Sequence, residues 1–507
     1  MSSNANLFSR FLECFPRKTN TFLVDGTGVG YTYDDLDKKS SDVAYNLLDK
    51  GLIAGDRVTL IAEKSLNVLW IYLGCLRAGG VFHPINPDYT RAEVEFFLKD
   101  ARPKILITDG SVASKIGSLP SQIECLTAHL QIPAVDGEGL LREVGGKEHN
   151  LFPCHINACN DTAALLYSSG TTGDPKGICL THGNLYENAV SLCHAWQFSS
   201  SDVLLHTLPI FHVHGLFIAL GPVLISGASM QYRNRFIVEE VIEALPKATI
   251  MMGVPTYYTR LLDSPNFTSE SSKNIRVFIS GSAPLTENVF RRFEHRTCQK
   301  IMERYGMTET GVNSSNPIDG DRIPGSVGLV LPGVELRIIN GKGNKVEGQT
   351  IGAIQVRGDN VFPRYWGLSD KTRQAFDEAG WFDTGDQGSM NSKGYLFISG
   401  RSKDMIITGG LNVYPKEVER ELEKVSGIVE TAVFGVPHRD FGEGVMAAVV
   451  MLDGEQLEEG SIVDVLNGQL AKFKIPKHIF AVDKLPRNAM GKVIKGELRK
   501  RYAGFFS

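Results

Sequence analysis

Hydroxyl groups, glycines and one lysine crowd into the segment YSSGTTGDPKG, residues 167 to 177. Backbone N–H groups and hydroxyls can surround phosphate oxygens, glycines allow close backbone approach, and a lysine neutralises phosphate charge. The spacing differs from the common P-loop, because Pro175 stands where that pattern needs glycine. The alternative is a flexible surface turn. The candidate phosphate-binding residues are Ser168, Ser169, Gly170, Thr171, Thr172, Gly173 and Lys176.

Four more motifs follow in order: RYGMTET (304–310), WFDTGDQG (381–388), GRSKDMIITGGLNVYPKEVE (400–419) and PRNAMGKV (486–493). Glu309 offers the hard carboxylate oxygen that Mg²⁺ prefers, beside the hydroxyl of Thr308. Asp386 lies in a glycine-flanked turn, where a carboxylate can accept hydrogen bonds from hydroxyl groups. The alternatives are a solvated Thr-Glu pair and a turn or helix-capping aspartate.

Apolar runs alternate with helical patterns in the part of the chain that must position these motifs. RVTLIA (57–62), KILIT (104–108), ATIMMGV (248–254) and IRVFISG (275–281) are typical of buried strands. SDVAYNLLDKG (41–51) and RAEVEFFLKDA (91–101) have helical periodicity. This alternation predicts an α/β fold of helix-covered parallel sheets.

From residue 334 onward, the sequence predicts short strands in place of the alternation of strands and helices. VELRIIN (334–340), GAIQVRG (352–358) and GYLFISG (394–400) predict closely spaced strands in a small, antiparallel, β-barrel-like section. After GRSKD the pattern predicts a compact α+β unit. We therefore expect an N-terminal core over residues 1–400 and a C-terminal domain over residues 401–507.

The composition favours small-molecule chemistry over polyanion binding. The formal net charge is only −4 and no long run of one sign occurs, so we expect no nucleic-acid partner. Eight scattered cysteines suit a reducing compartment, and Cys154, His155 and Cys159 lack the second ligand pair of a zinc site.

No membrane segment is expected either. The apolar part of residues 203–232 is shorter than the ~20 residues of a membrane helix, and it predicts buried core. The N-terminus lacks an apolar signal core, which makes the cytoplasm the default. A mitochondrial presequence is weakened by Glu13 and stays an alternative, and the oligomeric state is left open.

Together the five motifs resemble the ordered motif set of the adenylate-forming superfamily, which includes acyl-CoA synthetases, peptide-synthetase adenylation domains and firefly luciferases. The resemblance spans nearly the whole chain. It implies a large N-terminal region, a mobile C-terminal domain, Mg²⁺ as cofactor, and ATP and CoA as co-substrates. It also implies two half-reactions: a carboxylate and ATP give an acyl-adenylate, which a thiol then converts to acyl-CoA and AMP.

The resemblance assigns roles residue by residue. Lys492 would hold the carboxylate and α-phosphate oxygens, Thr308 the α-phosphate and Glu309 the Mg²⁺ ion. Lys403 matches the hinge of the mobile domain, and Gly409 and Gly410 would line the entry path of the thiol arm. Besides the first loop, the implied ATP-binding residues are Ser282, Ala283, Pro284, Tyr305 (stacked on adenine), Gly306, Met307, Asp386 and Arg401.

Arg304 bears on the identity of the acid. Many superfamily members for apolar acids have a small residue before the YGMTE tyrosine, whereas this chain has arginine. Burial of a guanidinium is costly without an anionic partner, and a second carboxylate of the substrate can be that partner. Substrate contacts are also expected from His212, Arg260 and Ser282. LPIFHVHGLF, GVPTYYTRLL and LPRNAMGKV with their neighbours resemble the malonyl-CoA synthetases, so malonate is the expected acid and methylmalonate a second one.

Several alternatives stay open at this point. Arg304 could instead form a structural salt bridge, Arg260 could point into solvent, and His212 could be a core or gate residue. His214 has no assigned role. Other candidate functions are a CoA ligase for another short or medium-chain acid, a carrier-loading adenylation domain, and a non-catalytic nucleotide-binding scaffold.

Overall fold

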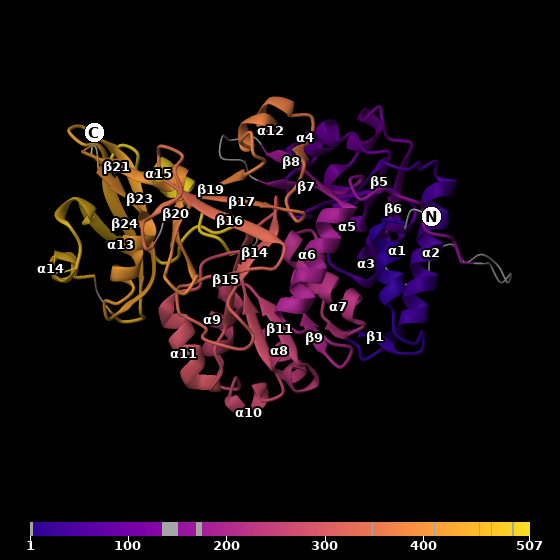
Figure 1. Ribbon diagram of the computed structural model, residues 1–507, viewed down its shortest axis with the longest axis horizontal. Coiled ribbons are helices and arrows are strands. Elements are labelled where there is room, and N and C mark those ends of the chain that lie inside the picture. Colours follow the sequence, from indigo (N-terminus) through magenta and orange to yellow (C-terminus); the bar gives the residue numbers. More distant parts are fainter. Residues whose placement is uncertain are drawn as a thin grey trace.

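The computed structural model describes residues 4–133, 151–168, 175–346, 348–409, 411–455, 457–467, 469–488 and 491–506. The chain folds into β-sheets covered by helices, which confirms the predicted α/β class. In Figure 1 the yellow C-terminal elements lie at one end of the molecule and the indigo N-terminal elements at the other.

A nine-stranded sheet carries most of the predicted site segments. Its order is β15 (Leu329–Val330), β14 (Gly311–Ser315), β13 (Met302–Met307), β12 (Val277–Ser280), β11 (Ile250–Gly253), β9 (Val203–His206), β10 (Ser229–Tyr232), β1 (Thr21–Val24) and β2 (Gly30–Thr32). The central strands β13, β12, β11, β9 and β10 run parallel, as predicted.

A second sheet has seven strands. Its order is β18 (Arg364–Tyr365), β8 (Lys176–Thr181), β7 (Thr162–Ser168), β4 (Val81–Ile85), β3 (Arg57–Ile61), β5 (Ile105–Thr108) and β6 (Ala128–Gln131). Strands β7 and β8 form an antiparallel hairpin that flanks the predicted phosphate loop. Of that loop, Ser168 and Lys176 are paired across the hairpin, whereas Ser169, Gly170, Thr171, Thr172 and Gly173 lie outside the described residues.

One hydrophobic core joins the two large sheets through helices that lie between them. Helix α3 (Leu66–Arg77) is buried along its whole length, as expected of a helix that is apolar all round. The π-helix η2 (His214–Ala219) and helix α7 (Leu220–Ser226) are also buried and pack against α6 (His182–Ala195). Residues 203–232 therefore form core, as predicted.

The other helices of this region cover the sheets. They are α1 (Leu7–Cys14), α2 (Tyr33–Asp49), α4 (Arg91–Ala101), α5 (Gly110–Ile116), α8 (Val238–Ala244), α9 (Pro255–Asp263), α10 (Ser269–Ser272) and α11 (Glu287–Thr297). Helix α4 spans the predicted residues because Thr90 and Glu93 form a capping box at its start and Arg102 adopts a left-handed conformation at its end.

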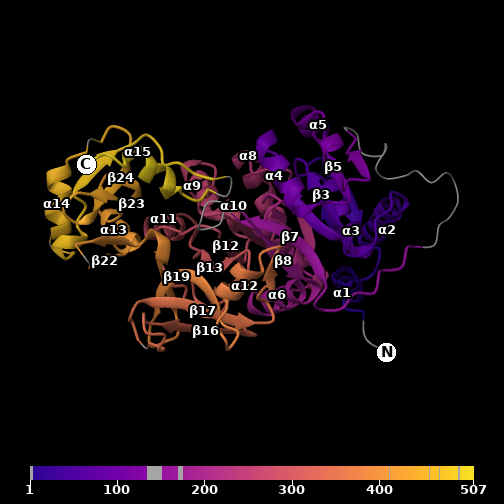
Figure 2. The ribbon, with the colours of Figure 1, turned by 90° about the horizontal axis from the view of Figure 1, so that it is seen from above.

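The predicted barrel-like section is an open antiparallel sheet. Its four strands are β16 (Val334–Ile339), β17 (Gly352–Gly358), β19 (Phe382–Met390) and β20 (Leu396–Arg401), in that order. In the described part of the chain β16 and β20 are edge strands, so the section is antiparallel as predicted but does not close into a barrel. Figure 2 shows β16 and β17 along one side of the molecule, near α12 (Ser369–Ala375).

Among the described residues, the last sheet shares no strand with the others. It consists of β22 (Leu411–Val413), β21 (Ile406–Thr408), β24 (Gly442–Met451), β23 (Ile428–His438) and β25 (His478–Ala481). Its helices are α13 (Pro415–Leu422), α14 (Glu459–Asn467) and α15 (Lys495–Tyr502). No helix in the described ranges is both long and apolar enough to cross a membrane.

Candidate functional site

One edge of the nine-stranded sheet gathers the predicted site segments. Strands β9, β11, β12 and β13 are parallel neighbours, so their carboxyl ends meet at this edge. Strands β9, β11 and β12 end there at His206, Gly253 and Ser280. Strand β13 runs on past β12 and turns into β14, which places the RYGMTE motif at the same edge.

Three predicted ATP-binding residues form one hydrogen-bonded cluster. Tyr305 Oη donates to Asp386 Oδ2 at 2.6 Å, and Arg401 Nε lies 2.9 Å from Asp386 Oδ1. Asp386 and Arg401 are directly paired on β19 and β20, which fixes their approach. Burial, followed by the Asp386 charge, holds the pKa of Tyr305 well above its usual value, so its phenol remains a donor. The cluster leaves further Asp386 lone pairs for ribose hydroxyls.

Glu309 is a buried carboxylate beside this cluster. Its exposed fraction is 6 %, and no ion pair between described residues includes it. Tyr365 Oη is 3.5 Å from Glu309 Oε1, and Lys176 Nζ lies 5.1 Å from the centroid of the Tyr365 ring. Burial raises the pKa of Glu309, so a bound cation would stabilise its charged form.

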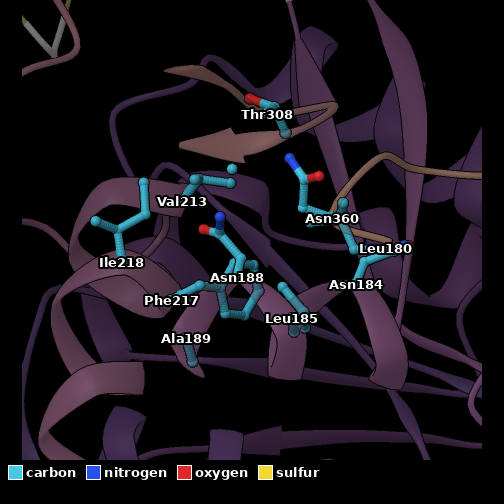
Figure 3. Close-up of a pocket in the computed structure, with 11 residues that line it drawn as sticks. Leu180, Asn184, Leu185, Asn188, Ala189, Val213, Phe217, Ile218, Thr308 and Asn360 are labelled. Carbon is cyan, nitrogen blue, oxygen red and sulfur yellow. The ribbon is translucent and has the colours of Figure 1, made fainter. Parts of the chain in front are cut away.

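Thr308 lies at the rim of a small cavity between α6, η2 and the β13–β14 turn. Figure 3 shows the amide groups of Asn188 and Asn360 directed into the same space, with Phe217 and Leu185 on its opposite side. Asn360 Oδ1 is buried and has no hydrogen-bond partner. Asn188 pairs with both backbone groups of Val312, and Asn360 Nδ2 donates to the Thr310 carbonyl, so these amides hold the backbone around Thr308 in place.

Lys492 reaches the site from near the C-terminus. The turn that carries it is closed by hydrogen bonds between Asn488 and Lys492, and its Gly491 packs against Thr256 at the start of α9. Part of the Lys492 side chain remains exposed. Even so, burial by the surrounding protein, followed by the positive charge of Arg401, lowers its pKa to about 8. The structure thus brings Lys492 within electrostatic reach of the Asp386 cluster.

The predicted hinge lies between β20 and β21. Lys403 is part of a short 3₁₀ turn, Ser402–Asp404, where Gln387 donates to the Ser402 hydroxyl and Asp404 pairs with Arg499. Gly409 is exposed in the turn after β21, with a left-handed φ of 57° and its N–H donating to the Phe441 carbonyl. Gly410 lies outside the described residues.

Arg304 is buried without a counter-ion. Its exposed fraction is 5 %, no ion pair between described residues includes it, and its Nε and Nη2 have no hydrogen-bond partner. This arrangement disagrees with the alternative of a structural salt bridge. Burial lowers the pKa of Arg304 to about 10, which leaves the guanidinium charged at neutral pH. A charged buried donor with free N–H groups requires an anion.

Two histidines and a serine surround this guanidinium. Ser282, at a left-handed φ of 71°, places its hydroxyl 3.1 Å from His214 Nδ1. His214 Nε2 is buried and has no partner. Burial and the Arg304 charge lower the pKa of His212 to about 4 and hold that of His214 well below its usual value, so both rings are neutral. The group can therefore bind an anion through a single positive charge and several neutral donors.

The remaining predicted residues lie around this centre. Ala283 is half-buried and Pro284 exposed in the loop before α11, and Met307 is half-buried at the end of β13. Gly306 lies so close to the Gly311 carbonyl that it has no room for a side chain. Arg260 is exposed on α9, a position that agrees with the alternative in which it points into solvent.

His214 and Tyr365 contact the predicted site residues Ser282 and Glu309, although no role was predicted for either. His214 is the second histidine of FHVHG, and the π-helix that begins there turns its ring toward Ser282. Tyr365 comes from β18, which pairs with the strand that begins at Lys176. The FHVHG pattern offered a signal for His214, whereas Tyr365 offered none.

Family models match two parts of the chain. Residues 8–366 match the AMP-binding enzyme family, and residues 417–492 match the AMP-binding enzyme C-terminal domain. The first match alone covers more than half of the chain, and together the two include most of the predicted site residues.

Individual relatives are similar along nearly the whole chain. The ATP-bound crystal structure of MatB from Rhodopseudomonas palustris is 44% identical, with a TM-score of 0.95 and coverage of 99% of this chain and 100% of that one. A malonate–CoA ligase named mitochondrial, from Mus musculus, is 32% identical over 94% of this chain and 88% of its own. An indoleacetate–CoA ligase from Aromatoleum aromaticum is 33% identical over 88% of both chains.

Proposed function

Since the chain belongs to the AMP-binding enzyme family and is an AMP-forming acyl-CoA ligase, we propose that its acid substrate is malonate. The products would be malonyl-CoA, AMP and pyrophosphate, formed through a malonyl-adenylate, with methylmalonate as a second substrate. The buried, unpaired guanidinium of Arg304 is the observation that carries this proposal.

The chemistry of malonate matches the group around Arg304. One carboxylate must reach the α-phosphorus of ATP, and the other, one methylene away, needs a cationic partner that is out of water. Arg304 supplies the charge, while Ser282, His214 and His212 add neutral hydrogen-bonding groups. A monocarboxylic acid would leave Arg304 buried and unpaired, which is costly.

The first half-reaction uses the cluster around Asp386. Asp386, with Arg401 and Tyr305, would hold the ribose, and Lys176 and the loop before it would hold the phosphates. A malonate oxygen attacks the α-phosphorus and pyrophosphate leaves. Lys492 and Thr308 would stabilise the negative charge on the α-phosphate and the attacking carboxylate.

Glu309 fits the Mg²⁺ that such a reaction requires. It is a buried carboxylate without an ion pair among the described residues, and its neighbour Tyr365 packs against Lys176. Bound there, Mg²⁺ would neutralise phosphate charge. Glu309 would hold the ion, and Tyr365 would orient the carboxylate.

The second half-reaction would use the C-terminal domain, residues 401–507. The thiolate of CoA attacks the acyl carbon, the acyl–phosphate bond breaks and AMP leaves. Rotation about Lys403 would bring Gly409 and Gly410 to the thiol entry path. Within the described ranges, the last sheet shares no strand with the rest of the chain, which supports such a motion.

The eight free thiols suit a reducing compartment. We propose the cytoplasm, with the mitochondrion as the alternative that the name of the mouse relative raises.

The test of this proposal is CoA-dependent AMP and pyrophosphate formation with malonate, methylmalonate, oxalate, acetate and octanoate. We expect the highest rate of AMP and pyrophosphate formation with malonate and the second highest with methylmalonate. If acetate or octanoate leads, the ligase assignment stands and the malonate proposal is wrong. Loss of ATP–pyrophosphate exchange with every acid would favour the alternative of a non-catalytic nucleotide-binding scaffold.

A further inference from the structure

Lys64 is a buried cation outside the residues assigned so far. It lies in the loop between β3 and α3, with an exposed fraction of 8 %, and no ion pair between described residues includes it. Its Nζ is 2.8 Å from His206 Nδ1, 3.0 Å from the His206 carbonyl oxygen and 4.3 Å from the centroid of the Tyr232 ring. Burial lowers the pKa of Lys64, whereas these three acceptors favour the ammonium form.

Tyr232 ties the lysine loop to the sheet. Its hydroxyl donates to the Ser65 carbonyl at 3.1 Å, and it is paired with His206 at the ends of β10 and β9. The lysine, the tyrosine and the histidine thus form one rigid group at the edge where the site lies.

The contacts of His206 fix its tautomer. His206 Nε2 is 2.9 Å from the Gly215 carbonyl, which can only accept, so Nε2 carries the proton. His206 Nδ1 is then the acceptor for Lys64. Burial and the Lys64 charge lower the pKa of His206, which keeps the ring neutral.

The hydrogen bond from His206 is accepted by the carbonyl oxygen of Gly215, the residue that follows His214 in the chain. A β-carbon at position 215 would stand 2.1 Å from the Pro209 carbonyl oxygen, so Gly215 has no room for a side chain and its backbone packs closely against Pro209. The hydrogen bond from His206 Nε2 adds a second contact to this backbone. His214, at the start of the same π-helix, lies 3.1 Å from the Ser282 hydroxyl in the group around Arg304.

We propose that Lys64 is a positioning residue for the acid pocket: through His206 it fixes the Gly215 peptide, and thereby holds the His214 ring against Ser282 and Arg304. This inference rests on the proposed malonate pocket. Loss of the Lys64 ammonium leaves His206 Nδ1 without its donor, so the ring can turn or change tautomer and release Gly215.

The experiment compares Lys64→Met, His214→Ala and the double variant in steady-state kinetics with malonate and ATP. We expect Lys64→Met to raise the KM for malonate about tenfold, the effect of a lost hydrogen bond to a charged group, while the KM for ATP stays within about twofold. The double variant should be no worse than His214→Ala alone, because both changes act on one contact.

Arg77→Met is the matched control. Arg77 is also a buried cation, at the opposite end of α3 from Lys64, but it pairs with Asp37 at 2.7 Å and has no part in the acid pocket. We expect this variant to unfold at lower temperature with an unchanged KM for malonate. If Lys64→Met does not fold, Lys64→Gln takes its place in the same comparison.

The outcomes separate this inference from the proposed function. If the wild type forms no malonyl-CoA, both fail. If the wild type is active but the KM values for malonate and ATP rise together, or the single effects multiply in the double variant, only the positioning role of Lys64 is wrong.

Discussion

Gly281 and Arg304 lie in such close contact that a β-carbon at position 281 would stand 2.3 Å from Arg304 Cζ and Nε. Gly281 comes directly after β12, and Arg304 lies on the neighbouring strand β13. The absent side chain at position 281 therefore leaves the room that the Arg304 guanidinium occupies in the proposed acid pocket.

Gly281→Ala should displace Arg304 without removing its charge. We expect the KM for malonate to rise about tenfold or more, since a buried charge-assisted hydrogen bond is lost, while the KM for ATP changes little. Steady-state kinetics checks both values. Gly460→Ala is the matched control, because Gly460 lies in helix α14 with open space around its Cα. Equal malonate KM values for the two variants would argue against the role of this contact.

The pH dependence of adenylation should report on Lys492. Its pKa is lowered to about 8, so the ammonium that we propose as the partner of the α-phosphate is lost as the pH rises through 8. We expect malonate-dependent ATP–pyrophosphate exchange to fall above that pH. Lys492→Arg should keep the charge and flatten this limb of the profile.

Lys492→Ala serves as the control for that assignment. It should lower adenylation by about 100-fold or more, the usual effect of losing a transition-state charge partner, while thioester formation from supplied malonyl-adenylate continues. A variant that loses both half-reactions equally would contradict a role confined to adenylation.

Periodicity predicted the helices and strands well, because hydrophobic patterning is local. RAEVEFFLKDA is the helix Arg91–Ala101 in full, and IRVFISG contains the buried strand Val277–Ser280. Closure of a barrel depends instead on pairing between the first and last strands of a sheet. That pairing is long-range, and the predicted barrel-like section is open.

In the site, too, residue types could be predicted from local motifs, whereas the contacts between distant residues could not. Asp386 and Arg401 were recognised from motifs, but only the register of β19 and β20 pairs them. Lys64 and His206 are 142 positions apart and belong to no motif, so sequence spacing could not relate them. His214 and Ser282 are likewise 68 positions apart, so the FHVHG pattern alone could not show that the His214 ring lies next to Ser282.

Tyr305→Phe tests the ribose cluster. The change removes the hydrogen bond from Tyr305 Oη to Asp386 and keeps the aromatic ring. We expect the KM for ATP to rise about tenfold, as for a lost hydrogen bond to a charged group, with the KM for malonate nearly unchanged. Tyr395→Phe, which removes a hydrogen bond to the Asp321 carbonyl in a distant loop, is the control. A rise in the malonate KM alone would contradict the assignment.

The most direct measurement is the ratio of kcat/KM for malonate to that for 3-methylbutanoate, in the wild type and in Arg304→Met. The two acids have nearly the same shape, but 3-methylbutanoate carries methyl groups in place of the second carboxylate oxygens. We predict that the wild type favours malonate by about 100-fold or more and that Arg304→Met abolishes this preference, because discrimination rests on the buried charge. A preference for malonate that survives in Arg304→Met would contradict the claim that Arg304 binds the second carboxylate.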